Sequence, residues 1–583
     1  MRSLRWINLR FAVASAAWFA ALCAAATVVP AHAQIAAGGP GAAPESASAP
    51  APATRQARTT RPAAELPPIR PVTVYTKASA PFTPKPEDLP LVPSVSQYGI
   101  TWTFDQPARA GQFLNGDWYV VGPVTVKMID PRPLWGEEVK DPVEQGVVHE
   151  GRYAGRLARN GSTLNLPALA PRGRDANRGA QGVGFDSRIL GGCYDPDQFT
   201  QLPIAMKPGD SLVSTVSYRN EEIKSFAGNE RLDFIKTAAV LTCVAAPLPA
   251  DAFRPSYCDT AGSKIHLSRN LRRELLANLA PPKARLPRME LYVRAMERPW
   301  IDTVNHGFAS PRENFPMGDN GYNLAAVAGT ASLLLLIDQP ADQKEPLLVN
   351  MVQTGIDLWG LVRGGRSWSA FGGQSSGRKW PIVLAGTLLG DEEMAAPGKK
   401  YPKTHFGEDD QTALCPYTFD GKTYERGWTG ARAIFTGHTP QEAGPVRWED
   451  GRGPIELLPP SEWPKGRMGE ARFPVSEGYR RMETSIAWVG EALAARILHA
   501  EKAWGHDAFF AYVDRWMTED DAAQLEEILK AGGPDYRGIK PLRQGRQGAT
   551  SSEFVAEMWA KYRDSLPPWA DGTQTPPAGS TWK

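Results

Sequence analysis

The chain has little net charge and few of the residues that most often bind metals. Its 65 basic and 63 acidic residues leave a formal net charge of +2, and the 583 residues include only eight His and five Cys. A nucleic-acid-binding protein usually carries a field of one sign, so this balance argues against that class. No Cys/His cluster has zinc spacing, and no P-loop, Rossmann fingerprint or HExxH motif is present. The sequence therefore predicts no metal, no cofactor and no nucleic-acid partner.

The chain does have an export signal at its start. Residues 1–10 carry three Arg and no acid, residues 11–29 are apolar and rich in Ala, and the small Ala31 and Ala33 frame a cleavage site. A retained anchor is the alternative, because an apolar run of about 19 residues is just long enough to span a bilayer. The helix-breaking Pro30 favours cleavage after Ala33. We expect a secreted or periplasmic protein with a signal peptide at 1–33 and no membrane span after cleavage.

Composition divides the rest of the chain into four segments. Residues 34–98 are rich in Pro and Ala, which predicts a disordered linker because such a segment buries too little apolar surface. Residues 99–263 contain runs of Val, Ile, Tyr, Trp and Thr between turn signals, which predict an antiparallel β-sandwich domain. Residues 264–566 show helical periodicity, and several of the expected helices are apolar almost all round. Residues 567–583 are expected to form a flexible tail.

The periodicity also predicts individual elements. Strands are expected at 100–104, 118–129, 151–157 and 211–218, with a bulge or edge position at Gly122-Pro123. Helices are expected at 265–279, 322–337, 345–362, 378–389, 484–502, 507–517, 521–531 and 553–562.

The helical region has a recurring order. A buried helix of small residues is followed by a more amphipathic helix, then by a long Gly- and aromatic-rich loop and another buried helix. This order resembles the (α/α) toroids of six-hairpin glycosidases and polysaccharide lyases, which commonly join a toroid to a β-sandwich. The resemblance covers roughly residues 100–565 and lies in architecture. It implies a multidomain β plus α protein, with an N-terminal antiparallel β-sandwich followed by an (α/α) toroid-like helical domain, acting on a polysaccharide or oligosaccharide.

Acidic residues in the loops suggest glycoside hydrolysis. That reaction needs two carboxyls facing one bond, about 5 to 10 Å apart, one of them protonated. The adjacent Glu408, Asp409 and Asp410 would raise at least one pKa among themselves if desolvated. The acids proposed for the opposite wall are Glu313, Asp319 and Glu477. The alternative for the acid cluster is a solvated turn or a helix N-cap.

The same loops also suit a lyase. Tyr479 or His405 could take the proton beside a uronate carboxyl, while Arg, Asn or Gln neutralises the developing charge. The candidate substrate-binding residues are Asn305, His306, Arg312, Tyr322, Trp368, Gln374, Arg378 and Arg481. The alternative for Arg480 and Arg481 is pairing with Glu477 and Glu483 at a helix start.

A pair of cysteines and a G-x-S-x-G match are two further patterns in the sequence. Cys243 and Cys258 flank a Pro-rich loop, and an oxidising compartment predicts a disulfide between them. Residues 373–377 match G-x-S-x-G, but the segment before them is a poor strand, which favours a loop turn over a nucleophilic Ser375. The sequence thus favours a glycoside hydrolase over a lyase, with a non-catalytic carbohydrate-binding or envelope protein as the third possibility.

Overall fold

The computed structural model describes residues 68–139, 155–168, 184–188, 194–219, 222, 234–302, 321–438, 451–464, 474–532 and 550–566. Contacts divide the chain into two units, Met1–Pro68 with Arg467–Arg472 and Ile69–Gly466 with Phe473–Lys583. The second unit holds every helix and strand named below. The predicted signal peptide and tail, and most of the strand expected at 151–157, lie outside the described residues.

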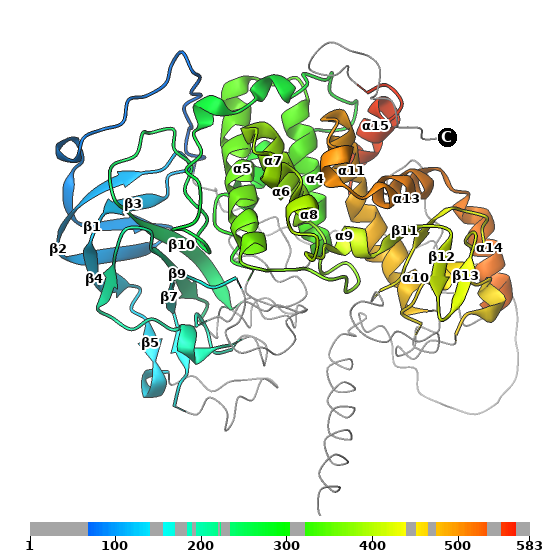
Figure 1. Ribbon diagram of the computed structural model, residues 1–583, viewed down its shortest axis with the longest axis horizontal. Helices are drawn as coiled ribbons and strands as arrows, with labels where there is room; N and C mark the ends of the chain where they lie inside the picture. The colour runs from blue at the N-terminus through cyan, green and yellow to red at the C-terminus, as the bar shows by residue number, and fades with distance from the viewer. Residues whose placement is uncertain are drawn as a thin grey trace, which may run out of the picture. The chain divides into compact units, whose positions relative to one another are not determined.

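The first part of this unit is an eight-stranded mixed sheet (Figure 1). Its strand order is β7-β9-β10-β3-β2-β4-β8, and β1 pairs with β2. The strands are β1 (Leu91–Gln97), β2 (Ile100–Gln112), β3 (Trp118–Val121), β4 (Val124–Asp130), β7 (Ser162–Leu164), β8 (Ile204–Met206), β9 (Ser211–Ser217) and β10 (Ile235–Val244). The pair β3–β10 is parallel, so the prediction of a wholly antiparallel arrangement is wrong there. These two strands are joined through β4 to β9, and a connection of that length can return the chain in the parallel direction.

Strand β2 curls this sheet. Its first half pairs with β4, whereas its last residues, Ala110 to Gln112, pair with β3. Gly122-Pro123 separates β3, which pairs with the end of β2, from β4, which pairs with its beginning. The single strand expected at 118–129 is therefore two strands. The curl brings strands that are not neighbours in the sheet around one apolar core. The indole of Trp102 in β2, for example, donates to Ser214 Oγ in β9 at 3.0 Å. The longer strands of this region thus form one curled mixed sheet around an apolar core.

The second part of the unit is mainly helical (Figure 1). Its helices are α3 (Met289–Met296), α4 (Gly321–Leu336), α5 (Ala341–Arg363), α6 (Lys379–Leu389), α7 (Glu392–Ala395), α8 (Pro397–Lys400), α9 (Gly407–Asp410), α10 (Val475–Tyr479), α11 (Ser485–Ile497), α12 (Glu501–Trp504), α13 (Asp507–Thr518), α14 (Asp521–Gly532) and α15 (Glu553–Tyr562), with a π-helical turn at Arg480–Thr484. This part also contains two short strand pairs, β11 (Thr412–Leu414) with β14 (Ala433–Phe435) and β12 (Tyr417–Phe419) with β13 (Lys422–Tyr424). A third short pair, β5 (Leu134–Trp135) with β6 (Ala158–Arg159), lies in the sheet region. No helix of the described residues is both long and apolar enough to cross a membrane.

Helix prediction succeeded for the long elements and failed at one place. Seven of the eight expected helices correspond to α4, α5, α6, α11, α13, α14 and α15. The helix expected at 265–279 is wrong, because that segment has only two 3₁₀ turns. Its Arg269 and Arg273 side chains instead bind Asp251 and Glu345, and these tertiary ion pairs fix an irregular path.

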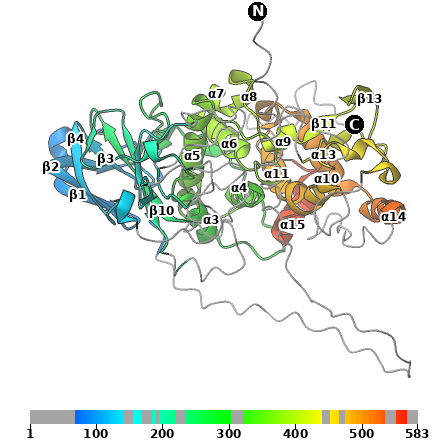
Figure 2. The ribbon, with the colours of Figure 1, turned by 90° about the horizontal axis from the view of Figure 1, so that it is seen from below.

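The apolar helix α4 is covered by α11, and the two lie side by side (Figure 2). Glycines make the crossing close: a Cβ at Gly329 of α4 would lie 2.6 Å from the backbone nitrogen of Glu491 in α11. The small residues of α4 are therefore explained by helix packing within the core.

A buried ion pair joins the sheet to the helices. Arg254 Nε donates to Asp117 Oδ2 in the β2–β3 turn at 2.5 Å, and its Nη2 donates to Asp357 Oδ2 in α5 at 2.6 Å. All three side chains are almost completely buried. This contact orients α5, and with it the loop that follows α5.

Two predictions about the sheet region are corrected. The linker predicted at 34–98 extends too far toward the C-terminus. Ile69, Val72 and Tyr75 already pack on the helical core, and β1 belongs to the sheet. Cys243 and Cys258 are free thiols, so the expected disulfide is absent. Cys243 Sγ faces Gly122 across the sheet, whereas the chain from β10 leads Cys258 away to α5.

Candidate functional site

The segment after α5, residues 366–378, brings distant parts of the helical region together, and we call it the central loop. Trp368 N–H donates to the carbonyl of His405 at 2.8 Å, and Gly372 N–H donates to the carbonyl of His438 at 2.9 Å. Gly377 N–H donates to Glu408 Oε1 at 2.5 Å. The central loop is therefore held along its length by the α9 segment and by the chain after β14.

A His–Asp pair lies beside the middle of the central loop. His405 Nδ1 is 3.0 Å from Asp410 Oδ1, and Asp410 Oδ2 accepts the backbone N–H of Ala370 at 3.1 Å. A carboxylate only accepts hydrogen bonds, so Nδ1 of His405 carries the hydrogen of this contact. Burial raises the pKa of Asp410. The His405 side chain is 32% exposed, which leaves it accessible for proton transfer.

A Tyr–His pair lies two residues further along the central loop. The rings of Tyr479 and His438 meet edge to face at 4.4 Å, and His438 also contacts the ring of Phe371 at 4.7 Å. Tyr479 is half-buried and ends α10, directly before the π-helical turn. Such turns occur frequently at functional sites.

Glycine at position 372 makes this contact possible. Gly372 has φ +57°, and a Cβ there would lie 2.4 Å from Tyr479 Cδ1 and 3.1 Å from His438 Cδ2. We expect Gly372→Ala to lower the free energy of unfolding by about 1–3 kcal/mol, from backbone strain and displaced rings. Thermal and denaturant unfolding measure this loss. The control is Gly398→Ala, where a Cβ meets no atom within 4 Å. Equal stabilities of the two variants would contradict this account of the contact.

The three adjacent acids occupy three different environments. Glu408 is fully buried, and burial raises its pKa to about 7. Asp409 accepts from the Lys379 ammonium group and, at 2.9 Å, from the Trp504 indole. Asp410 alone reaches the partly exposed part of the central loop, through His405 and Ala370.

Glu477 and Arg481, predicted to face substrate, contact each other. Glu477 is fully buried and accepts from Arg480 at 2.9 and 3.0 Å and from Arg481. Burial opposes its ionisation, but the two guanidiniums outweigh burial and hold the pKa of Glu477 at about 2. Arg481 also pairs with Asp521. The pairing alternative is confirmed for both Arg with Glu477, and Glu477 does not suit the role of a general acid.

Two of the predicted substrate-binding residues form an internal cluster. Arg378 Nη2 lies 3.2 Å from Asp302 Oδ1, and the Trp368 indole donates to Asp302. Arg366 is 3.4 Å from the same carboxylate. Arg378 and Trp368 are buried. They hold the central loop through Asp302 and do not line its partly exposed side.

The remaining predicted residues divide into two groups. Tyr322 lies beside the central loop, its Cβ 3.0 Å from the position a Cβ would take at Gly373, and Gln374 belongs to the loop itself. Asn305, His306, Arg312, Glu313 and Asp319 lie outside the described residues.

Sequence reasoning missed His438 and considered Glu483 only as a partner of Arg480 and Arg481. Glu483 Oε2 lies 3.4 Å from the position of a Cβ at Gly373, and the side chain is partly exposed. His438 follows a three-residue strand with no strong period, so only its rarity as one of eight His could have drawn attention to it.

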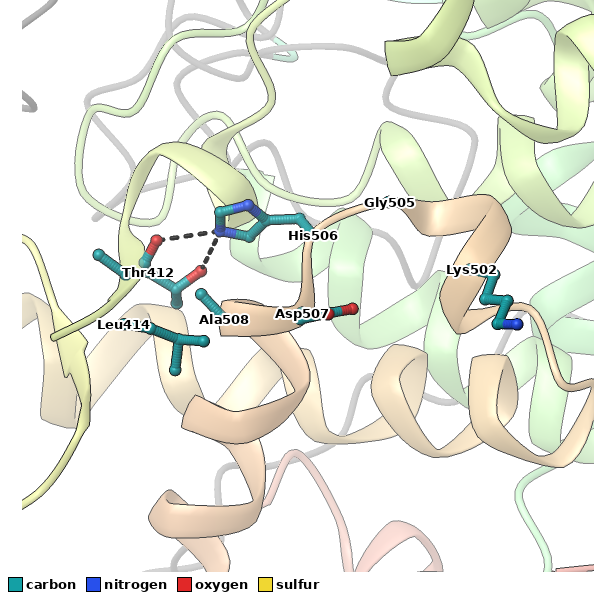
Figure 3. A pocket seen from close by; sticks show the side chains of 8 residues that line it. Thr412, Leu414, Lys502, Gly505, His506, Asp507 and Ala508 are labelled. Atoms are coloured by element: carbon teal, nitrogen blue, oxygen red, sulfur yellow. Dashed lines mark hydrogen bonds between the residues drawn. The ribbon is translucent and has the colours of Figure 1, made fainter. Parts of the chain in front are cut away.

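The described residues include a surface hollow of about 580 Å³ away from these pairs, at β11 and the start of α13 (Figure 3). His506 Nε2 lies 3.0 Å from the carbonyl oxygen of Thr412 and 3.1 Å from its Oγ1. The carbonyl accepts, so His506 donates and holds α13 to β11. No predicted site residue lines this hollow.

The described residues contain no group of three or more His, Cys, Asp and Glu that could hold a metal ion. Comparison of the chain with protein-family models, curated proteins and solved structures found no match.

Proposed function

We propose that the chain is an exported carbohydrate-active enzyme that cleaves a uronate-containing polysaccharide by β-elimination at the central loop. One observation carries the proposal: His405–Asp410 binds the loop at Ala370, and Tyr479–His438 meets it at Gly372. Two residues of chain span at most about 7 Å. The two points of the loop that these pairs contact are therefore no further apart than about one sugar unit.

Elimination needs one group to remove a proton and another to supply one. The base removes the proton from the carbon beside the uronate carboxyl. The electron pair of the broken C–H bond then forms a carbon–carbon double bond, and the bond from the neighbouring carbon to the glycosidic oxygen breaks. The acid protonates that leaving oxygen. His405, oriented by Asp410, and Tyr479 supply these two roles. Of the residues predicted from the sequence, Asn305 is the candidate for neutralising the uronate carboxylate, because Gln374 is buried like Arg378 and Trp368.

Hydrolysis is the second candidate, and a different pair of side chains favours it. Asp410 binds the loop at Ala370 and Glu483 lies beside Gly373, three residues further on. That span is at most about 10 Å, which is compatible with two glycosidase carboxyls about 6.5–9.5 Å apart. Asp410 belongs to the acid cluster that the sequence suggested, and Glu483 takes the place of Glu477 on the opposite wall. Glu408 and Glu477 are excluded because both are completely buried.

The finer architecture is part of the proposal. Consecutive helices α4, α5 and α6 pack against one another, and α11 returns to cover α4. This packing of neighbours supports a toroid-like helical region. The export signal supports a secreted or periplasmic location.

A polysaccharide panel tests the proposal and separates its alternatives. Purified mature protein is incubated with uronate-containing and neutral polysaccharides, and both reducing ends and the ultraviolet absorbance of unsaturated uronates are followed. We expect both signals to rise together on a uronate polysaccharide. Reducing ends without absorbance would establish hydrolysis instead. Binding without cleavage on every substrate would leave only the non-catalytic function.

A further inference from the structure

Two glutamates lie beneath the central loop without exposure to solvent, Glu408 of α9 and Glu491 of α11. Glu408 Oε1 accepts the Gly377 N–H. Among the described residues, Glu408 Oε2 and both carboxyl oxygens of Glu491 have no hydrogen-bond partner. An ionised carboxyl that is buried without hydrogen-bond partners raises the free energy of the folded protein strongly. Several such oxygen atoms in one place therefore need an explanation.

Glu491 lies one helical turn from a residue that contacts the same part of the loop as Glu408. Trp488 lies three residues before Glu491 on α11, so both side chains are on one face of the helix. The Trp488 indole donates to Ser376 Oγ at 3.0 Å, and Ser376 precedes the Gly377 that binds Glu408. Burial, and then the charge of Glu408, raise the pKa of Glu491 well above its ordinary value.

The surrounding charges leave room for one carboxylate. Among the described residues, Arg366 and Arg378 both face the carboxylate of Asp302, so the two guanidiniums carry one positive charge more than that carboxylate balances. The neighbouring Asp409 is already matched by Lys379. The packed helix α4 carries no Asp, Glu, Lys, Arg or His. One ionised glutamate therefore makes the cluster neutral, and a second would add an unmatched charge.

We propose that Glu408 and Glu491 together bind one proton at neutral pH, so that only one of these two buried carboxyls is ionised beneath the Ser376–Gly377 part of the central loop. Loss of that proton leaves two buried carboxylates that repel each other beneath the loop. The fold of the loop is thus sensitive to pH, whatever reaction the site performs.

The sign of the effect follows from linkage. A carboxyl whose pKa is raised in the folded protein contributes stability below its ordinary pKa of 4.5 and loses it as the pH rises through the raised value. Glu491→Gln removes one titrating group and keeps the shape. Between about pH 5 and pH 8 we expect its melting temperature to gain about 2–4 °C relative to wild type. The control is Glu392→Gln, an exposed acid in α7, which should follow the wild-type profile.

Infrared spectroscopy of the whole protein detects whether a buried carboxyl is protonated. We expect the carbonyl stretch of a protonated, buried carboxyl in wild type at neutral pH, and its loss in both Glu491→Gln and Glu408→Gln. Absence of that band from wild type overturns the proposal, as does its persistence in both variants. An unchanged pH profile of stability in Glu491→Gln does the same, and if that variant fails to fold, Glu408→Gln and the wild-type spectrum decide.

Discussion

Tyr479→Phe is expected to lower turnover on a uronate polysaccharide roughly 10²-fold or more, the scale of a lost general acid or base. The substitution removes only the phenolic oxygen. The ring remains to pack on Gly372 and against His438, so melting temperature should stay near that of wild type. Initial rates from the absorbance of unsaturated products, with stability measured in parallel, test this expectation.

Tyr424→Phe is the matched control, because Tyr424 lies in the β12–β13 hairpin, away from the central loop. It should cleave at the wild-type rate. A Tyr479→Phe enzyme with unchanged turnover would remove Tyr479 from the mechanism. If Asp410→Asn and Glu483→Gln then abolish cleavage while the products show no absorbance, hydrolysis takes the place of elimination.

Arg254→Met is expected to lower the free energy of unfolding by about 3–5 kcal/mol, because it leaves two carboxylates in a dry interior without their counter-ion. Burial already raises the pKa of Asp357 to about 6, against the opposing effect of Arg254. Without the guanidinium, Asp357 binds a proton more tightly. The loss should therefore be smaller in acid and grow as the pH rises through neutrality.

Denaturant unfolding at several pH values measures this loss. The control is Arg132→Met, whose ion pair with Glu138 is exposed, and it should leave stability nearly unchanged. A small, pH-independent loss in Arg254→Met would show that the junction between sheet and helices does not depend on this ion pair.

Local pattern was enough to predict most of the helices. Helices α4 and α6 are apolar almost all round, and such segments of this length form helices only where neighbours cover them. The strands around Trp102 and Leu212 were equally visible from their apolar and β-branched residues. The 3₁₀ turns near Arg269 were not, because ion pairs with Asp251 and Glu345 outweigh a helical period there.

By itself, the sequence determined the order of a strand region and a helical region and marked the polar loops between helices as candidates. Only the tertiary structure decided the roles within those loops. Glu408, Asp409 and Asp410 are adjacent in sequence, yet one is buried under Gly377, one is paired with Lys379 and one holds His405. The physical reason is that burial and partners set the protonation and access of a carboxyl, and the partners of Glu408 and Asp409 lie some thirty residues away along the chain.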